Sequence, residues 1–199
     1  MTKWNDKRRT MQHYDQAATV YDTQYYNEQE SKIKVALSGF TLEKEGIILD
    51  AGCGTGLLFP YVANRIRLVV GVDVSVSIIK QVKKRVKNYI NTALIRADAD
   101  FMPFPNGTFD FVFAVTLLQN MPKPFWTLDE LKRVTKHNAT IIATGLKKTF
   151  SQEDFTRLLR EAGLEIKAFR HDENLKDYVA VCVKSRRKPY NNRGGSVIA

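Results

Sequence analysis

The sequence predicts a three-layer α/β sandwich with a seven-stranded, mostly parallel sheet and an antiparallel edge strand. Three observations support this prediction. From residue 46 onward, short β-branched runs alternate with stretches of helical periodicity, the pattern of a parallel sheet covered on both faces. The first run leads directly into a glycine-rich loop. The last two runs follow each other with no helix between them, which predicts an antiparallel hairpin at the sheet edge.

The individual elements follow from local patterns. Strands are expected at the β-branched runs 47–50, 68–73, 93–97, 109–115, 139–145, 164–170 and 177–184. Helices are expected over 5–25, 29–40, 56–65, 75–90, 124–136 and 151–162. In the helix at 75–90 the apolar residues recur at spacings of three and four: Ile78, Ile79, Val82, Val86 and Ile90. Ser151, three residues before Asp154, predicts a capped start for the last helix, and Gly163 its end.

Length and composition limit the class of protein. A chain of 199 residues fits one domain with appendages. The amino terminus does not resemble a signal peptide, and no apolar run approaches the roughly 18 residues of a membrane span. Cys53 and Cys182 lie far apart, and neither they nor the three histidines show metal-ligand spacing. We therefore expect a cytoplasmic protein, monomeric or weakly dimeric, with reduced thiols and no metal.

The chain is strongly basic. Its 31 Lys and Arg against 21 Asp and Glu give a net charge of +10, which favours a polyanionic partner. We expect three parts: an N-terminal helical lid at 1–42, a ligand-binding core at 43–184, and a basic, disordered tail at 185–199.

The glycine-rich loop is Asp50-Ala51-Gly52-Cys53-Gly54-Thr55-Gly56, where a ligand can approach the backbone closely. A dinucleotide fingerprint would need a small residue at position 57 or 59, but these are Leu57 and Phe59. The phosphate-cradling loop with Lys followed by Ser or Thr is also absent. A nicotinamide dehydrogenase is therefore disfavoured.

The spacing Asp50-x-Gly52-x-Gly54-x-Gly56 instead resembles the first motif of the class I S-adenosylmethionine-dependent methyltransferases. Segments 69–73, 96–99 and 104–110 look like the later motifs of that family, in order. Residues 14–22 match the Y-D-x-x-A-x-x-Y-D opening helix of the subgroup that contains ubiquinone-biosynthesis-like enzymes. The resemblance covers roughly residues 10–184 and implies a Rossmann-like fold.

The resemblance implies that S-adenosylmethionine is the cofactor. Asp73, at a strand end, would accept hydrogen bonds from the ribose hydroxyls, and Asp98 with the Ala99 backbone would take the adenine. Asp50 would orient the amino-acid end, with backbone N–H groups of the helix at 56–65 near the carboxylate. The complete set of expected cofactor contacts is Tyr21, Asp50, Gly52, Cys53, Gly54, Gly56, Asp73, Val74, Asp98, Ala99 and Thr116.

Tyr14 and Gln119 are the expected substrate contacts, in a methyl-transfer site lined by residues 116–119. Simpler explanations remain open: Tyr14 and Tyr21 as core aromatics, Asp98 as a loop cap, and Cys53 as a small filler. The stripe of basic residues at 80–87 is expected to be a solvated helix face.

The methyl acceptor is open. The segment Gln119-Asn120-Met121-Pro122 lacks the stacking aromatic typical of amine methylation, and neither cysteine sits where pyrimidine C5 methylation needs one. The basic flanks, at 3–9 and 186–193, favour tRNA or rRNA over a small, quinone-like metabolite, with protein third. A non-catalytic partner subunit that binds S-adenosylmethionine is the competing class.

Overall fold

The computed structural model describes residues 8, 11 and 21–184, and within the last range the side chains from residue 25 onward. Tyr14, most of the helix expected over 5–25 and the tail at 185–199 lie outside the described residues.

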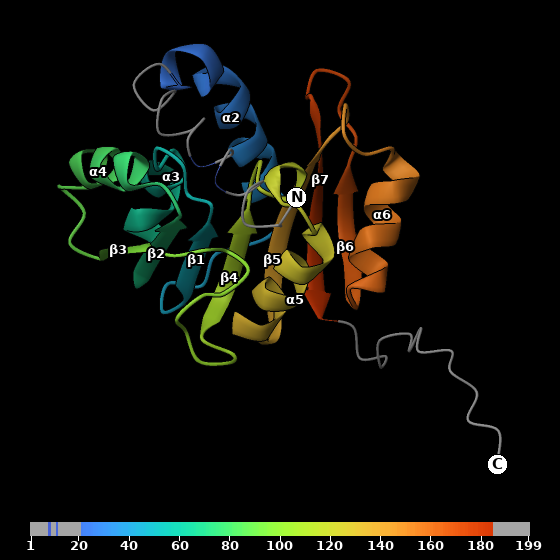
Figure 1. Cartoon of the computed structure of the whole chain (residues 1–199). Helices are drawn as coiled ribbons and strands as arrows, with labels where there is room; N and C mark the ends of the chain where they lie inside the picture. The colour runs from blue at the N-terminus through green and yellow to red at the C-terminus, as the bar shows by residue number, and fades with distance from the viewer. Residues whose placement is uncertain (1–7, 9–10, 12–20, 185–199) are drawn as a thin grey trace.

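One seven-stranded sheet forms the centre of the molecule (Figure 1). Its strands are β1 (Ile47–Ala51), β2 (Leu68–Asp73), β3 (Thr92–Arg96), β4 (Phe109–Ala114), β5 (Thr135–Leu146), β6 (Leu164–Arg170) and β7 (Asp177–Lys184). The order across the sheet is β3-β2-β1-β4-β5-β7-β6. Strands β1 to β5 pair in parallel, whereas β7 pairs antiparallel with both β5 and β6. The predicted sheet is confirmed, and the last hairpin inserts its second strand between β5 and the edge strand β6.

Helices cover both faces of the sheet, as predicted. Successive strand residues point to opposite faces, so Ile48 and Leu49 of β1 belong to two separate apolar clusters. The face of the sheet that carries Ile48 is covered by α2 (Tyr21–Leu37), α3 (Phe59–Val62) and α4 (Val76–Arg85). The face that carries Leu49 is covered by α5 (Pro124–Val134) and α6 (Gln152–Glu161). None of the helices in the described residues is long and apolar enough to cross a membrane.

Several helix boundaries differ from the prediction. The break expected between residues 25 and 29 is wrong, because α2 runs through it. Residues 56–58 form a turn, so the helix expected at 56–65 begins only at Phe59 and tightens into a 3₁₀ turn at Ala63–Arg65. Helix α4 ends at Arg85, which leaves Ile90 fully exposed; its assignment to the apolar stripe is wrong.

Other local signals are confirmed. The Ser151 hydroxyl accepts a hydrogen bond from the Asp154 N–H at 3.0 Å and caps α6. Strand β5 begins at Thr135 rather than at residue 139. Its pairing with β4 shifts register between Phe109 and Phe111, and the exposed residues 137–138 interrupt the apolar pattern from which strands are predicted.

Candidate functional site: a cleft at the carboxyl ends of β1, β2 and β4

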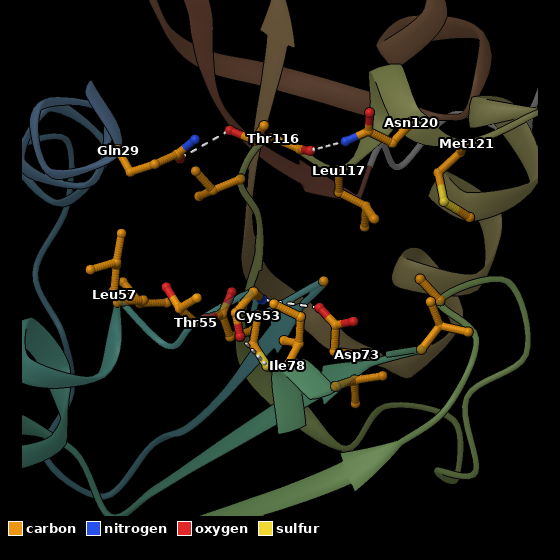
Figure 2. Close-up of a pocket in the computed structure, with 18 of the residues that line it drawn as sticks. Gln29, Cys53, Thr55, Leu57, Asp73, Ile78, Thr116, Leu117, Asn120 and Met121 are labelled. Atoms are coloured by element: carbon orange, nitrogen blue, oxygen red, sulfur yellow. Dashed lines mark hydrogen bonds between the residues drawn. The ribbon is translucent and has the colours of Figure 1, made fainter. Parts of the chain in front are cut away.

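The site lies where the strand order reverses, β1 having β2 on one side and β4 on the other. Ligands of open α/β sheets bind at this position, outside the carboxyl ends of the strands. A pocket opens there, and Figure 2 shows most of its lining. The lining residues are Gln29, Ile33, Asp50, Gly52, Cys53, Gly54, Thr55, Leu57, Leu58, Val72, Asp73, Val74, Ile78, Ala97, Asp98, Ala99, Val115, Thr116, Leu117, Asn120 and Met121.

The glycine loop after β1 forms one wall of the pocket. Gly52, Gly54 and Gly56 all have positive φ, between +51° and +79°, where side chains other than glycine are strained. A Cβ on Gly52 would lie 2.9 Å from Cδ1 of Leu117, so this glycine lets the loop pack against the segment after β4. A Cβ on Gly54 would meet no atom within 4 Å. Gly54 therefore leaves open space on the pocket side of the loop.

Asp73, at the end of β2, holds this loop in place. Its Oδ2 accepts a hydrogen bond from the Gly54 N–H at 3.0 Å, and its Oδ1 accepts one from the Ser75 N–H at 2.9 Å. Ser75 in turn caps α4 by accepting from the Ile78 N–H. The carboxylate thus ties the glycine loop and the start of α4 to one point at the floor of the pocket (Figure 2).

Asp50 is buried beside Asp73. Burial, reinforced by the negative charge of Asp73, raises the pKa of the Asp50 carboxyl to about 7. Burial and the same two carboxylates also raise the pKa of the Cys53 thiol well above its usual value. Cys53 is therefore an unreactive neutral thiol, which agrees with the small filler rather than the nucleophile.

Asp98 and Ala99 lie after β3 and line the pocket together with Val74. The Asp98 Oδ1 accepts a hydrogen bond from the Asp100 N–H at 3.0 Å, and its carbonyl accepts one from the Phe101 N–H at 2.9 Å. Asp98 thus stabilises the loop that it begins while still facing the pocket.

Thr116, directly after β4, is the most constrained residue of the site. Its φ of +58° is unusual for a β-branched residue, and among the described non-glycine residues only Asn138 shares a positive φ. Its N–H donates to Oγ1 of Thr144 at 2.8 Å, and its carbonyl accepts from Nδ2 of Asn120 at 2.7 Å. These two bonds hold a conformation that the residue alone would avoid.

The Thr116 side chain connects the core to α2. Its hydroxyl donates to Oε1 of Gln29 at 3.0 Å and accepts from Nζ of Lys32 at 3.3 Å (Figure 2 shows the first contact). Since an ammonium group can only donate, Lys32 leaves the hydroxyl proton of Thr116 free to be donated to Gln29.

Lys32 itself is buried, with 1% of its side chain exposed. Its Nζ lies 2.5 Å from Oδ2 of Asp177, at the start of β7, and 2.8 Å from Oε1 of Glu28. Burial raises the pKa of Asp177, and the charge of Lys32 opposes that shift. The ion pairs of Lys32 with Asp177 and Glu28 thus hold α2 against the start of β7.

The structure brings most of the expected residues to one pocket: Asp50, Gly52, Cys53, Gly54, Asp73, Val74, Asp98, Ala99 and Thr116. Gly56 and Gln119 do not line it. Gly56 serves packing, since a Cβ there would lie 2.9 Å from Cγ1 of Val82. The side chain of Tyr21 and the whole of Tyr14 lie outside what the structure describes.

Sequence reasoning missed Gln29, Ile33 and Lys32. They belong to a predicted helix, but nothing in its spacing indicates which side chains face a pocket formed by strands far along the chain. Asn120 and Met121 were considered only for amine methylation, and both line the pocket.

Comparison with known proteins agrees with this geometry. Residues 49–143 match the family described as methyltransferase domain. The malonyl-[acyl-carrier protein] O-methyltransferase of Marinomonas sp. is 26% identical over 144 residues, which cover 71% of this chain and 53% of the relative. The demethylmenaquinone methyltransferase of Bacillus licheniformis is 26% identical over 132 residues, which cover 65% of this chain and 56% of the relative. The chain thus spans about half the length of these curated relatives.

Solved structures share the fold. An S-adenosylmethionine-dependent methyltransferase from Aquifex aeolicus superposes with a TM-score of 0.76 at 20% identity, over 85% of this chain and 98% of that one. A chain of the complex between the Haloferax volcanii Trm112 methyltransferase activator and a putative methyltransferase superposes with a TM-score of 0.75 at 17% sequence identity. The match covers 86% of this chain and 97% of that one. Residues 49–143 thus match a methyltransferase domain, and the chain has the fold of S-adenosylmethionine-dependent methyltransferases.

Proposed function

We propose that this chain transfers a methyl group from S-adenosylmethionine, bound in the pocket at the ends of β1, β2 and β4, to an acceptor carried by RNA. The observation that supports cofactor binding most strongly is the space beside Gly54, bounded by the Asp73 carboxylate. A glycine, which has no Cβ, lies beside a charged acceptor at a strand end, and an adenosyl group with its ribose diol requires this combination of space and acceptor.

The remaining pocket residues are assigned by their chemistry. Asp98 and the Ala99 backbone would contact the adenine, with Val74 and Ile78 as its apolar surroundings. Asp50 would face the amino-acid end, where the ammonium favours the ionised carboxylate. Residues 54–58 form a turn before α3, so backbone N–H groups of this turn, not of a helix, would serve the carboxylate.

The methyl-transfer site would lie between α2 and the segment after β4, beside Gln29, Thr116, Asn120 and Met121. S-Adenosylmethionine supplies a methyl group on a sulfonium, which is already a good leaving group. The protein therefore has to align the acceptor and exclude water. Thr116, fixed by its contacts to Thr144, Asn120 and α2, would provide a rigid wall for that alignment.

An RNA acceptor is favoured by the net charge of +10. A small-molecule acceptor is the second candidate, because the relative from Bacillus licheniformis is named for a quinone and the opening-helix motif is of that subgroup. A partner subunit is a further possibility for either acceptor, since one structural neighbour is a complex with a methyltransferase activator.

The test is incubation of the full chain with methyl-labelled cofactor and separate pools of total RNA, protein and small-molecule extract. We expect label in RNA, decreasing steeply as salt rises because released counterions make binding salt-sensitive. The Asp73→Ala variant is the control and should label the RNA less than the wild type at the same cofactor concentration, because its affinity for the cofactor is lower.

Label found only in the small-molecule pool would contradict an RNA acceptor and support a small-molecule acceptor. Cofactor binding without label in any pool, even after addition of a cell extract that contains partner proteins, would support the non-catalytic class instead.

A further inference from the structure

The positive charge of the described chain is concentrated at one end of the sheet. Residues 51–97 contain eight Lys and Arg but only one acid, Asp73. Residues 98–184 contain twelve of each. The acid-poor segment builds β2, α4 and β3, which Figure 1 shows together at one end of the molecule. The excess charge of the core is therefore local and is not confined to the flanks outside the described residues.

Four lysines of this segment lie on α4 and in the turn that follows it. Lys80, Lys83 and Lys84 have the i, i+3, i+4 spacing of one helix face, Lys87 lies in the turn after the helix, and all four side chains are exposed. None of them forms an ion pair with a residue in the described part of the chain. We call these four residues the α4 basic face.

Several basic side chains elsewhere on the surface pair with acids. Arg157 pairs with Asp154, Lys167 with Glu165, and Lys136 with Asp110. Favourable interaction with the helix dipole explains basic residues only in the last turn of α4, whereas Lys80 lies before that turn and Lys87 beyond it. The α4 basic face is therefore an unneutralised charge array.

This face leads to the pocket. Helix α4 starts at Val76, two residues after Val74 in the pocket wall, and its ten residues run about 15 Å away from it. Arg96 is exposed at the end of β3, where it lies opposite Asp73 in the register of the β2–β3 strand pair. It adds a positive charge next to the pocket residues Ala97 and Asp98. A phosphate backbone that follows α4 from Lys87 toward Val76 therefore arrives at the pocket mouth.

We propose that the α4 basic face, extended by Arg96, is the docking path for an RNA strand whose nucleotide enters the pocket. Ile78 and Val82 of α4, and Val86 directly after it, are buried, and of the large apolar residues of the helix only Val76, at its start, is exposed, so α4 has no apolar face to insert into a lipid surface. This favours a phosphate backbone over a membrane. The proposal deepens the RNA acceptor proposed above and rests on it.

The test measures binding of unfractionated tRNA to the full chain by fluorescence anisotropy over a range of salt concentrations. The triple variant Lys80→Gln, Lys83→Gln, Lys87→Gln removes three charges from the face. The matched control, Lys148→Gln, Arg160→Gln, Lys167→Gln, removes three exposed charges from the balanced segment. Both retain the flanks and the pocket.

We expect the slope of log K against log salt to become shallower by about 2 in the triple variant, at roughly 0.7 per lost phosphate contact. The control slope should stay close to that of the wild type. Equal slopes in both variants, or wild-type binding to phosphatidylserine vesicles but not to tRNA, would overturn the docking path. Calorimetry with S-adenosylmethionine on the same variants tests cofactor binding separately, because neither set of substitutions touches the pocket, and the labelling experiment above decides the proposed function.

Discussion

At the scale of single residues, Asp50 connects cofactor binding to pH. Its pKa of about 7 means that most of the carboxyl is protonated in the free protein at pH 6. A bound cation favours the carboxylate, so binding of S-adenosylmethionine at pH 6 should release up to one proton, and affinity should rise with pH up to about 7. Calorimetry in buffers of different ionisation enthalpy measures this release. Binding without proton release, or equal release by Asp50→Asn, would mean that Asp50 does not face the cofactor.

The same residue should make stability depend on pH. The folded-state pKa of Asp50 is raised above its usual 3.8, so the folded state binds more protons and stability falls as pH rises from about 4 to about 7. Asp50→Asn removes this term. Its free energy of unfolding relative to wild type should increase by about 1.4 kcal/mol per pH unit in that window, as measured by urea unfolding. A constant difference between the two proteins would show that Asp50 is not titrating there.

Gly54 should matter for binding and not for folding alone. Gly54→Ala adds a methyl group to the open space of the pocket and should weaken S-adenosylmethionine binding at least tenfold, or about 1.4 kcal/mol. Gly107→Ala is the control, because Gly107 also has a positive φ, of +66°, and its Cβ would meet no atom closer than 3.8 Å. Both variants should lose about 1–2 kcal/mol of stability from backbone strain. An unchanged affinity in Gly54→Ala would place the cofactor elsewhere.

At the scale of elements, the buried Lys32–Asp177 pair fastens α2 to β7. Lys32→Met leaves an uncompensated carboxylate and should cost about 3–5 kcal/mol in urea unfolding. The double variant Lys32→Met, Asp177→Asn should cost less than the sum of the two single variants, since neither charge is then left alone. The exposed pair Arg157–Asp154 is the control, and Arg157→Met should cost under about 1 kcal/mol. Equal costs for Lys32→Met and Arg157→Met would contradict a structural role for the buried pair.

The elements themselves were largely predictable from the sequence, and the errors have local physical causes. Strands β1, β2, β4 and β7 are buried on both faces, so their apolar runs are nearly continuous and easy to recognise. Periodicity alone placed Ile90 on the apolar face of a helix that in fact ends at Arg85. The prediction of helix at residues 56–58 is wrong, because glycine and leucine carry little information about where the first helical turn begins.

At the scale of the whole molecule, sequence motifs identified the side of the pocket nearest β1 and β2 but not the side formed by α2. Asp50, Gly54 and Asp73 lie within 24 residues of sequence and follow a recognisable spacing. The contact of Lys32 with Thr116 joins residues 84 apart, and Asp177 lies still further along the chain. Such a contact depends on how α2 lies on the sheet, which no local pattern encodes.

The whole-molecule arrangement also explains why a short chain can suffice for cofactor binding. The ends of four strands, β1 to β4, and residues of helices α2 and α4 line the described pocket, and the acid-poor segment supplies much of this lining. The central claim of this account is that the pocket holds S-adenosylmethionine, with Asp73 as its charged acceptor.

The most direct measurement is calorimetric titration of the full chain with S-adenosylmethionine and, separately, with NAD. We predict one S-adenosylmethionine site per chain and no heat with NAD. We also predict a loss of about 1–3 kcal/mol of binding free energy in Asp73→Ala, in which hydroxyls lose their charged acceptor. Tight binding of NAD with no response to S-adenosylmethionine, or an affinity for S-adenosylmethionine that is unchanged in Asp73→Ala, would contradict that claim.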